Sequence, residues 1–584
     1  MLHRLRQEAT WLNLLLLSGL VGLMVVLVMP LYSLFVRSLY NRRGEFVGLD
    51  NYLSYLTSGG ITGSAWNSFW VAIVSMLIVV TFAFAAAYAL SRTKIAGKGL
   101  VRLLLTLPIL APSLLPAISL IYLFGNQGIL KHWLMGASIY GPIGIILGSV
   151  FWTFPHALMI LLTALSQADA RQYEAAQSLK ASPWRTFWTV TIPSARYGLV
   201  SAAFVVFTLV ITDFGVAKVI GGNFNVLATD IYRNVIGQQR FEMGAVIGVI
   251  LLLPAILAFA ADRWVQKKQA AALSARSVPY QPKDSLKTKI LGFGLLTPSI
   301  FFILLVIGMA VYASFLTYWP YNRSFTLNNY DFVRFDPAGW TPYFNSLKMA
   351  TMTMVIGTLM IFVNAWLVER CPQPKWLRNL YQLLALLPMA VPGLVLGLAY
   401  IFFFNHPQNP LNNLYGGLLL MAICSLVHFY SVAHLTSVTA LKQLDPEFEA
   451  VGDSLKSSRT GLFARLTLPL SLPAILDVAL YLFVNAMTTV SAVVFIYGHN
   501  SRLASIMIMS LEEAGGTAAA AALSVIIMLT CAAAKILHSL LMMLVNAKHN
   551  AWKGKVQTSQ EKSSTAKSRK LAWLWRKAPA NQGA

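Results

Sequence analysis

Residues able to do chemistry are sparse in this chain of 584 residues. A phosphate-binding loop of the form GxxxxGK[ST] is missing, because Gly97-Lys98 and Gly554-Lys555 lack both the spacing and the following hydroxyl residue. Histidines, cysteines and carboxylates show no metal-ligand spacing, and no Ser/His/Asp set shares a predicted face. We therefore predict no catalytic residue, no metal site and no cofactor.

Asp213 is the most unusual ionisable residue, because it lies near the outer end of an apolar segment, where a charge is costly. It could line a pathway or receive a polar solute, and a structural hydrogen bond to a neighbouring helix end is equally consistent with its place. The candidate pathway residues are Asp213, Thr212, Thr488, Thr489 and Ser491. The histidines in the apolar segments, for which interhelical packing is the commoner use, are His156, His428 and His434.

The elements that must position these residues are apolar helices. Hydrophobic residues make up 57% of the chain and charged residues 11%, whereas soluble proteins average about 25% charged residues. This composition excludes a water-soluble enzyme and predicts an all-α polytopic membrane protein. Twelve runs approach the roughly 20 residues that a membrane span needs. They lie near 12–36, 69–91, 103–124, 141–165, 198–217, 245–262, 290–316, 347–368, 380–404, 416–438, 473–496 and 519–545.

The basic residues predict the orientation of these twelve spans. The net charge of +24 would suggest a nucleic-acid partner in a soluble protein. With the N-terminus inside, however, the cytoplasmic segments collect 33 of the 45 Lys and Arg residues, and the outer loops hold only 9. This is the positive-inside pattern, so we expect cytoplasmic N- and C-termini and no nucleic-acid partner. The basic linker and tail favour contact with anionic membrane lipids, and a specific regulatory partner is the alternative.

The chain contains a tandem duplication. Residues 163–193 align without gaps on residues 439–469 with twelve identities, and the pairs Asn51-Tyr52 and Asn67-Ser68 recur as Asn329-Tyr330 and Asn345-Ser346. Both halves begin on the same side, so two parallel six-span bundles would face a central pathway. The predicted domains are a first half (1–262), a linker (263–289), a second half (290–545) and a basic tail (546–584).

The repeated loop is the most specific feature of the sequence. Residues 170–180 favour a helix, and Ser182 can cap a second helix with Pro183 in its first turn. We expect Pro193 to stop that helix before the next span. Three aromatic residues are predicted to share one face turned away from the bilayer: Trp184, Phe187 and Trp188. Such a helix–turn–helix elbow could dock a partner, or it could be a re-entrant loop that packs against its own bundle.

This loop resembles the EAA loop of binding-protein-dependent ABC importer permeases, the MetI-like family. Glu174-Ala175-Ala176 and Ile192-Pro193 match the ends of the motif. The motif's glycine is replaced by Lys180 and Lys456, and Ala450-Val451-Gly452 stands where the second Glu-Ala-Ala would be. The two predicted loops, at 166–197 and 439–472, could therefore bind their partner with unequal strength.

The resemblance implies a fused pair of type I permease bundles in a bacterial inner membrane. Its implied partners are two copies of a cytoplasmic ABC ATPase subunit and a periplasmic solute-binding protein. In that family the loop couples the permease to the ATPase. The coupling residues carried over to this sequence are Glu174, Ala175, Ala176, Lys180, Ser182, Trp184, Phe187, Pro193, Ala450, Gly452, Lys456, Ser458, Phe463 and Pro469.

The substrate is the least determined feature. The stretch from Thr212 to Tyr232 resembles fused permeases for ferric iron, thiamine and 2-aminoethylphosphonate, and the resemblance is nearest to the last of these. A polyamine is a further alternative within the same machinery. Two other classes stay open: a proton-coupled secondary transporter with Asp213 as its proton carrier, and a membrane scaffold without transport.

Overall fold

The computed structural model describes residues 2–59, 61–272, 278, 280–282, 284–445, 447–455 and 457–576. Within these residues, nine helices are long and apolar enough to cross a membrane, or up to twelve if each of three bent helix pairs is one span. The predominantly helical architecture with candidate membrane spans is thus confirmed, while the count of twelve spans and the location of the termini stay predictions. Lys456, one of the predicted coupling residues, lies outside the described part of the chain.

The long helices of the first half follow one another in the order that the apolar runs predict. Its helices, with π- and 3₁₀-segments labelled η, are α1 (Leu2–Leu23), η1 (Met24–Val28), α2 (Met29–Ser38), α3 (Asp50–Thr57), η2 (Ile61–Ala65), α4 (Trp66–Arg92), α5 (Lys98–Thr106), η3 (Leu107–Leu110), α6 (Leu114–Phe124), η4 (Lys131–Leu134), α7 (Pro142–Ser166), α8 (Ala170–Ser178), α9 (Pro183–Thr186), η5 (Phe187–Thr191), α10 (Ile192–Ile211), α11 (Gly215–Ile220), α12 (Leu227–Tyr232), η6 (Arg233–Gly237) and α13 (Phe241–Ala272).

The second half repeats this order and adds a small hairpin. Its elements are α14 (Leu286–Ser314), β1 (Leu316–Tyr318), β2 (Asn322–Phe325), η7 (Asn328–Tyr330), η8 (Phe332–Arg334), α15 (Thr341–Arg370), α16 (Lys375–Leu386), η9 (Leu387–Ala390), α17 (Gly393–Phe404), η10 (Asn412–Leu414), α18 (Leu418–Lys442), α19 (Glu447–Ser454), α20 (Arg459–Leu462), η11 (Phe463–Thr467), α21 (Leu468–Leu470), α22 (Leu472–Thr488), η12 (His499–Ser501), α23 (Ala504–Glu513) and α24 (Thr517–Arg576). Strands β1 and β2 pair antiparallel.

Prolines break the third predicted span of each half. The helix from Lys98 to Leu110 meets α6 at 100°, and the helix from Lys375 to Ala390 meets α17 at 112°. Pro112 and Pro392 lie at these corners, where a residue without an N–H cannot continue the helical hydrogen bonds. In lipid, such open backbone is tolerated only where protein or water covers it, so these corners are candidates for the walls of a pathway.

The first helices of the two halves are exchanged. Helix α1 packs against α15 and α16 of the second half, and α2 packs against α17. In the corresponding way, α14 packs against α4, α5 and α6 of the first half. The sequence predicted two separate bundles facing each other; the structure instead interleaves them, because each half covers apolar surface on the other.

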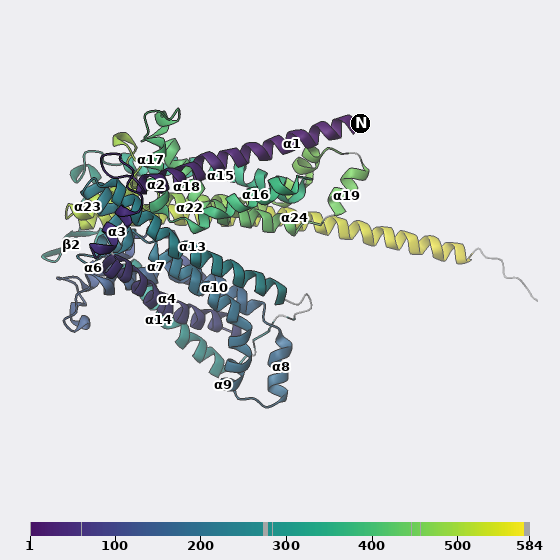
Figure 1. The fold of residues 1–584 in the computed structure, drawn as a ribbon. Helices are drawn as coiled ribbons and strands as arrows, with labels where there is room; N and C mark the ends of the chain where they lie inside the picture. Colours follow the sequence, from purple (N-terminus) through teal and green to yellow (C-terminus); the bar gives the residue numbers. More distant parts are fainter. Residues whose placement is uncertain are drawn as a thin grey trace, which may run out of the picture.

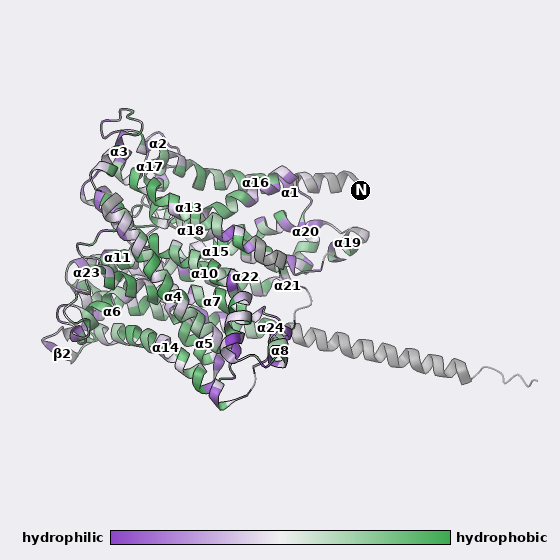
Figure 2. Cartoon of the chain, turned by 60° about the horizontal axis from the view of Figure 1, so that its bottom comes forward, coloured by the Kyte–Doolittle hydropathy of each residue, from purple (hydrophilic) through white to green (hydrophobic). Residues whose placement is uncertain are grey.

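Two lobes diverge toward one end of the molecule (Figure 1). Helices α8 and α9 lie at that end of one lobe and α19 at that end of the other, while α3, α6 and β2 gather at the opposite end. Figure 2 shows mainly hydrophobic residues along the long helices and hydrophilic ones near both ends. The elbows and the meeting point of the lobes thus lie at opposite ends of the helix bundle.

Candidate functional site

The first elbow forms as the sequence predicts at its two helix starts. The Asp169 carboxylate accepts a hydrogen bond from the N–H of Arg171 at 3.1 Å and so caps α8. The hydroxyl of Ser182 accepts one from the N–H of Arg185 at 3.2 Å and caps α9. Trp184 and Trp188 are 70% and 53% exposed, which leaves an aromatic face without a covering element in the described chain. Such a face is typical of a docking surface.

Phe187 clusters with the two tryptophans, with ring centroids 5.9 Å from Trp184 and 5.5 Å from Trp188, as the sequence predicts, but it is only half exposed. Its ring lies 6.1 Å from that of Phe84 and 5.8 Å from that of Tyr88, both on α4. The wider π-helical turn η5 shifts the register between α9 and α10, so Phe187 points inward while the tryptophans stay outside. Pro193 does not stop the helix: α9, η5 and α10 form one continuous helix from Pro183 to Ile211, in which the π-helical turn η5 directly precedes the proline.

The second elbow has the same construction. Ser458 caps α20 by accepting a hydrogen bond from the N–H of Gly461 at 3.0 Å. A π-helical turn, η11, follows as η5 does in the first half. Phe463 packs inward on Trp366, with ring centroids 4.5 Å apart, and Pro469 lies in the first turn of α21. The duplication therefore extends to the irregular turn that directs each aromatic anchor inward.

Lys180 adopts the backbone conformation that favours glycine. Its φ is +54°, in the left-handed region, directly after α8. A residue with a Cβ is strained there, which explains in physical terms why the related motif carries glycine at this place. The side chains of Glu174 and Ala175 are exposed on α8, whereas Ala176 is buried.

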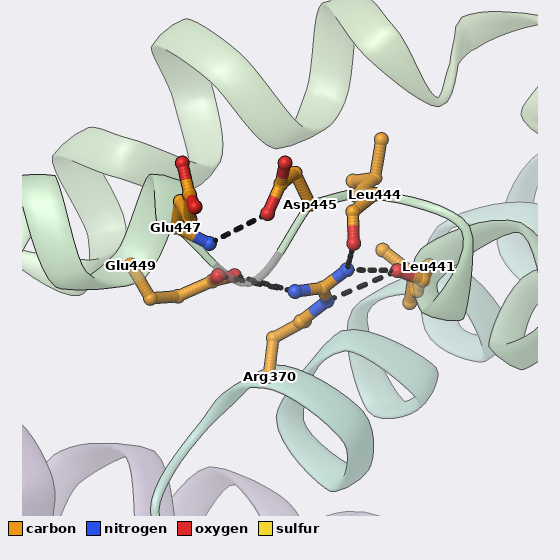
Figure 3. A network of polar contacts seen from close by, with 6 residues as sticks. All are labelled: Arg370, Leu441, Leu444, Asp445, Glu447 and Glu449. Atoms are coloured by element: carbon orange, nitrogen blue, oxygen red, sulfur yellow. Dashed lines mark hydrogen bonds and ion pairs between the residues drawn. The ribbon is translucent and has the colours of Figure 1, made fainter.

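In the second elbow, Glu449 rather than the Ala450-Val451-Gly452 triplet makes the structural contact. The Arg370 guanidinium binds the Glu449 carboxylate at 3.0 Å, and both side chains are largely buried. Arg370 also donates to the carbonyl oxygens of Leu441 and Leu444, so it ties α15 to the chain between α18 and α19 (Figure 3). Gly452 is buried in α19 against Leu462 of α20.

The first elbow uses an arginine at the same place with a different partner. Arg92 ends α4 as Arg370 ends α15, and it donates to the Leu165 carbonyl at 3.0 Å. Where the second half has Glu449, the first has Tyr173, whose hydroxyl lies 3.1 Å from the guanidinium. We did not select these arginines from the sequence, although both end the second predicted span of a half. Their shared position in the repeat is the signal that could have identified them.

Asp213 joins two broken helices. Its Oδ2 accepts a hydrogen bond from the N–H of Val216 at 3.1 Å, at the start of α11. Thr212 is partly exposed, and its hydroxyl donates a hydrogen bond to the Thr208 carbonyl oxygen. The structural alternative considered for Asp213, a bond to a helix end, is therefore present.

The start of α11 lies against the corner before α6. A Cβ on Gly215 would overlap the Oγ of Ser113, so there is room for the serine side chain only because residue 215 is glycine. In the second half the residue types are exchanged: a Cβ on Gly393 would lie 2.7 Å from the Oγ of Ser491 and 3.0 Å from Nε2 of His428. Thr488 and Ser491 are partly exposed and Thr489 is buried, so the candidate pathway residues gather where broken helices meet.

The two halves touch beside these breaks through residues that the sequence did not single out. Lys218 of α11 forms an ion pair with Glu513 of α23 at 2.7 Å. The rings of Tyr232 and Phe495 stack with centroids 6.2 Å apart, and the Tyr122 hydroxyl lies 2.9 Å from that of Thr517. These contacts hold the lobes together at the end opposite the elbows.

Comparison with known proteins decides the family. Residues 80–270 and 371–543 match the family described as the binding-protein-dependent transport system inner membrane component. The chain belongs to this family. Each of the two matched segments contains its own elbow. The duplication of the permease unit inferred from the repeat is therefore confirmed. Members of this permease family are transport components, and an ABC ATPase and a periplasmic binding protein are their general partners.

Related permeases cover most of this chain or one half of it. The ferric transport system permease protein FbpB of Actinobacillus pleuropneumoniae is 27% identical over 86% of this permease and 74% of its own length. The putative ferric transport system permease protein FbpB 1 of Haemophilus influenzae is 27% identical over 83% of the chain and 78% of its own length. A probable sulfate transport system permease protein of Nephroselmis olivacea is 24% identical over 42% of the chain and 87% of its own length. None of these three is named for a phosphonate.

Proposed function

We propose that the chain is the fused transmembrane subunit of an ABC importer that takes up ferric iron delivered by a periplasmic binding protein. Two ferric permeases with similarity over more than four fifths of the chain support this substrate. The earlier preference for 2-aminoethylphosphonate has no such support, because it depended on a short stretch around Asp213. Thiamine and polyamines stay alternatives within the same machinery.

The observation that carries the proposal is the paired elbow. Each half presents a capped helix outside the long helices, with an aromatic anchor that packs inward on its own bundle. On the first elbow the exposed tryptophans provide an apolar surface, and on the second Leu455 and Val451 are exposed. Two elbows of the same backbone construction suit two copies of one ATPase subunit, with different exposed side chains on each elbow.

Alternating access follows from this arrangement. When ATP draws the two ATPase subunits together, the docked elbows approach each other and the lobes close at that end. The inward anchors Phe187 and Phe463 transmit the motion to α4 and α15, because a packed aromatic side chain moves with its neighbours. The contacts at the far end, including Lys218–Glu513, then open to admit the solute.

A proton-coupled secondary transporter is the competing class. In that mechanism Asp213 would carry the proton, yet one of its oxygens already binds the helix α11. A helix cap of this kind is a structural role that Asp213 fills without any proton transfer, so its place in the fold is explained without a proton carrier.

Two measurements on the partners test the substrate and the coupling. We expect the partner binding protein to bind ferric iron in calorimetry, and the iron-loaded form to stimulate ATP hydrolysis by the reconstituted complex at least about tenfold. A binding protein that takes up thiamine or 2-aminoethylphosphonate and ignores ferric iron would reject iron as the substrate. Stimulation by any such loaded binding protein would still support the importer mechanism.

A further inference from the structure

Each elbow is held by chain at, or just before, the start of the first helix of the opposite half. The segment just before α14 touches the first elbow, and the start of α1 touches the second elbow. Helices α14 and α1 are equivalent in the repeat, and each crosses to the other half. We name these contacts the first brace (Val278, Tyr280 and Asp284) and the second brace (Glu8).

The first brace extends the start of α8. The N–H of Ala170 donates to the Val278 carbonyl at 2.9 Å, and the N–H of Val278 donates to the Asp169 carboxylate at 3.4 Å. Asp169 is the residue that caps α8, so the brace and the cap share one carboxylate. The backbone of the segment is thus fixed to the first residue of the elbow helix.

Aromatic and charged contacts complete the first brace. The Arg92 guanidinium lies 4.6 Å from the ring of Tyr280 and 4.8 Å from the ring of Tyr173, and the two rings are 4.7 Å apart. Asp284 forms ion pairs with Lys289 of α14 at 2.7 Å and with Lys94 of the first half at 3.5 Å. The first elbow, α4 and the start of α14 therefore share one network.

The second brace reaches α20 from the N-terminal helix. A carboxylate oxygen of Glu8 accepts hydrogen bonds from both the N–H and the hydroxyl of Thr460, each at 3.0 Å. Thr460 lies in the first turn of α20, where N–H groups have no partner within the helix and a negative charge is stabilised. Helix α1 runs from this contact along α15 and α16.

We infer that the two braces are positioning contacts that make the elbows move together with the exchanged helices. An elbow displaced by its ATPase subunit would pull the first helix of the other half, so one stroke would reach both lobes. The residues that hold this coupling are Tyr280 on the first brace and Glu8 on the second. This inference rests on the proposed importer function.

A purely structural role makes a different prediction. If the braces only stabilise the fold, their loss lowers the amount of folded complex, and uptake and ATP hydrolysis fall in proportion. If they position the elbows, their loss leaves the ATPase running without transport, because the hydrolysis step no longer moves both lobes. The ratio of solute taken up to ATP hydrolysed separates the two roles.

The test uses the full complex in proteoliposomes with the loaded binding protein. We expect Tyr280→Ala and Glu8→Gln each to lower solute uptake per ATP at least about threefold, with additive effects in the double variant. Tyr280→Phe retains the ring over Arg92 and should keep the wild-type ratio. The matched controls are Gln281→Ala, next to Tyr280, and Asp50→Asn, an exposed carboxylate at the opposite end of the molecule.

An unchanged uptake-to-ATP ratio in both brace variants would overturn the inference, as would a proportional fall of the two rates. A wild-type complex that takes up nothing with ATP would reject the importer function itself. Because the wild type is measured alongside the variants, the two failures are distinguishable. Equal loss in Gln281→Ala would also contradict a specific role for Tyr280.

Discussion

The Oγ of Ser113 lies so close to Gly215 that a Cβ there would overlap it, and the second half makes the same contact with the residue types exchanged. There, Gly393 follows the corner and Ser491 faces it. Each contact pairs one glycine with one serine hydroxyl. The two halves therefore keep the same close spacing between their broken helices, although serine comes first along the chain in the first half and glycine comes first in the second. This relationship fixes how closely the two breaks approach in both halves.

The Ser113–Gly215 contact predicts a reciprocal pair of variants. We expect Gly215→Ser alone to lower the free energy of unfolding by about 1–3 kcal/mol, because the added side chain overpacks the contact. The double variant Ser113→Gly/Gly215→Ser reproduces the order of the second half and should recover most of the loss. Thermal unfolding of the detergent-solubilised protein measures both. If the double variant is no more stable than Gly215→Ser, removing the Ser113 side chain does not relieve the overpacking, and the account of this contact is wrong.

The first elbow predicts different effects for two neighbouring aromatic residues. Trp184→Ala removes an exposed side chain, so it should reduce binding of the ATPase subunit at least about tenfold with little change in unfolding temperature. Phe187→Ala removes an inward anchor and should lower stability by about 2–4 kcal/mol. Pull-down of the ATPase and thermal unfolding separate the two outcomes. Retained ATPase binding by Trp184→Ala would argue against docking at this face.

Lys180 predicts a stabilising substitution. Its positive φ strains any residue with a Cβ, so Lys180→Gly should be more stable than Lys180→Ala by about 1 kcal/mol. Both variants remove the same charge, and the comparison therefore isolates the backbone term. Thermal unfolding of the two variants checks it, and equal stability would mean that the loop relaxes. A separate variant, Lys180→Glu, should uncouple ATP hydrolysis from transport if this lysine meets an acidic groove on the ATPase.

Replacing Arg370 should lower the free energy of unfolding more than replacing Arg92 does. Arg370→Met leaves the buried Glu449 charge unpaired and should cost about 3–5 kcal/mol. Arg92→Met should cost less, because its partners Tyr173 and Tyr280 are neutral. The double variant Arg370→Met/Glu449→Gln should recover much of the stability, since no buried charge stays unpaired. Unfolding measurements on the three variants decide between this account and a merely steric role.

Glu512 predicts a dependence on pH at the contact between the halves. Burial, reinforced by the neighbouring Glu513, raises the pKa of Glu512 from 4.5 to about 7, against the opposing charge of Lys218. A carboxyl with a raised pKa contributes stability that is fully present below its unfolded pKa and is lost as pH rises through the folded value. We therefore expect the unfolding temperature to fall between about pH 4.5 and pH 7 more steeply in the wild type than in Glu512→Gln. Identical slopes would contradict the shift.

Much of this architecture could be predicted from the sequence, because its signals are local or repeated. The apolar runs identified the long helices, and Ser182 with Pro183 predicted the start of α9 by capping rules alone. The repeat indicated two elbows before any contact was known. The predicted helix end at Pro193 was wrong, since a π-helical turn before the proline lets the helix continue from Pro183 to Ile211.

The contacts between distant segments could not be predicted in the same way. The exchange of α1 and α14 between lobes leaves no local pattern, because their apolar surface would suit lipid or either half. Tyr280 and Glu8 were unremarkable in the sequence, and only the fold brings them to the elbows. The Asp213 carboxylate was a sound candidate by its location, yet its hydrogen bond to Val216 needed the structure.

Transport by the purified complex in proteoliposomes tests the central claim most directly. Vesicles that contain this permease, its ATPase and the iron-loaded binding protein should accumulate ferric iron when ATP is supplied on the ATPase side, with no proton gradient. The same vesicles without the ATPase should accumulate none, whatever proton gradient is imposed. Uptake that persists without the ATPase and follows the proton gradient would contradict the account and favour a secondary transporter.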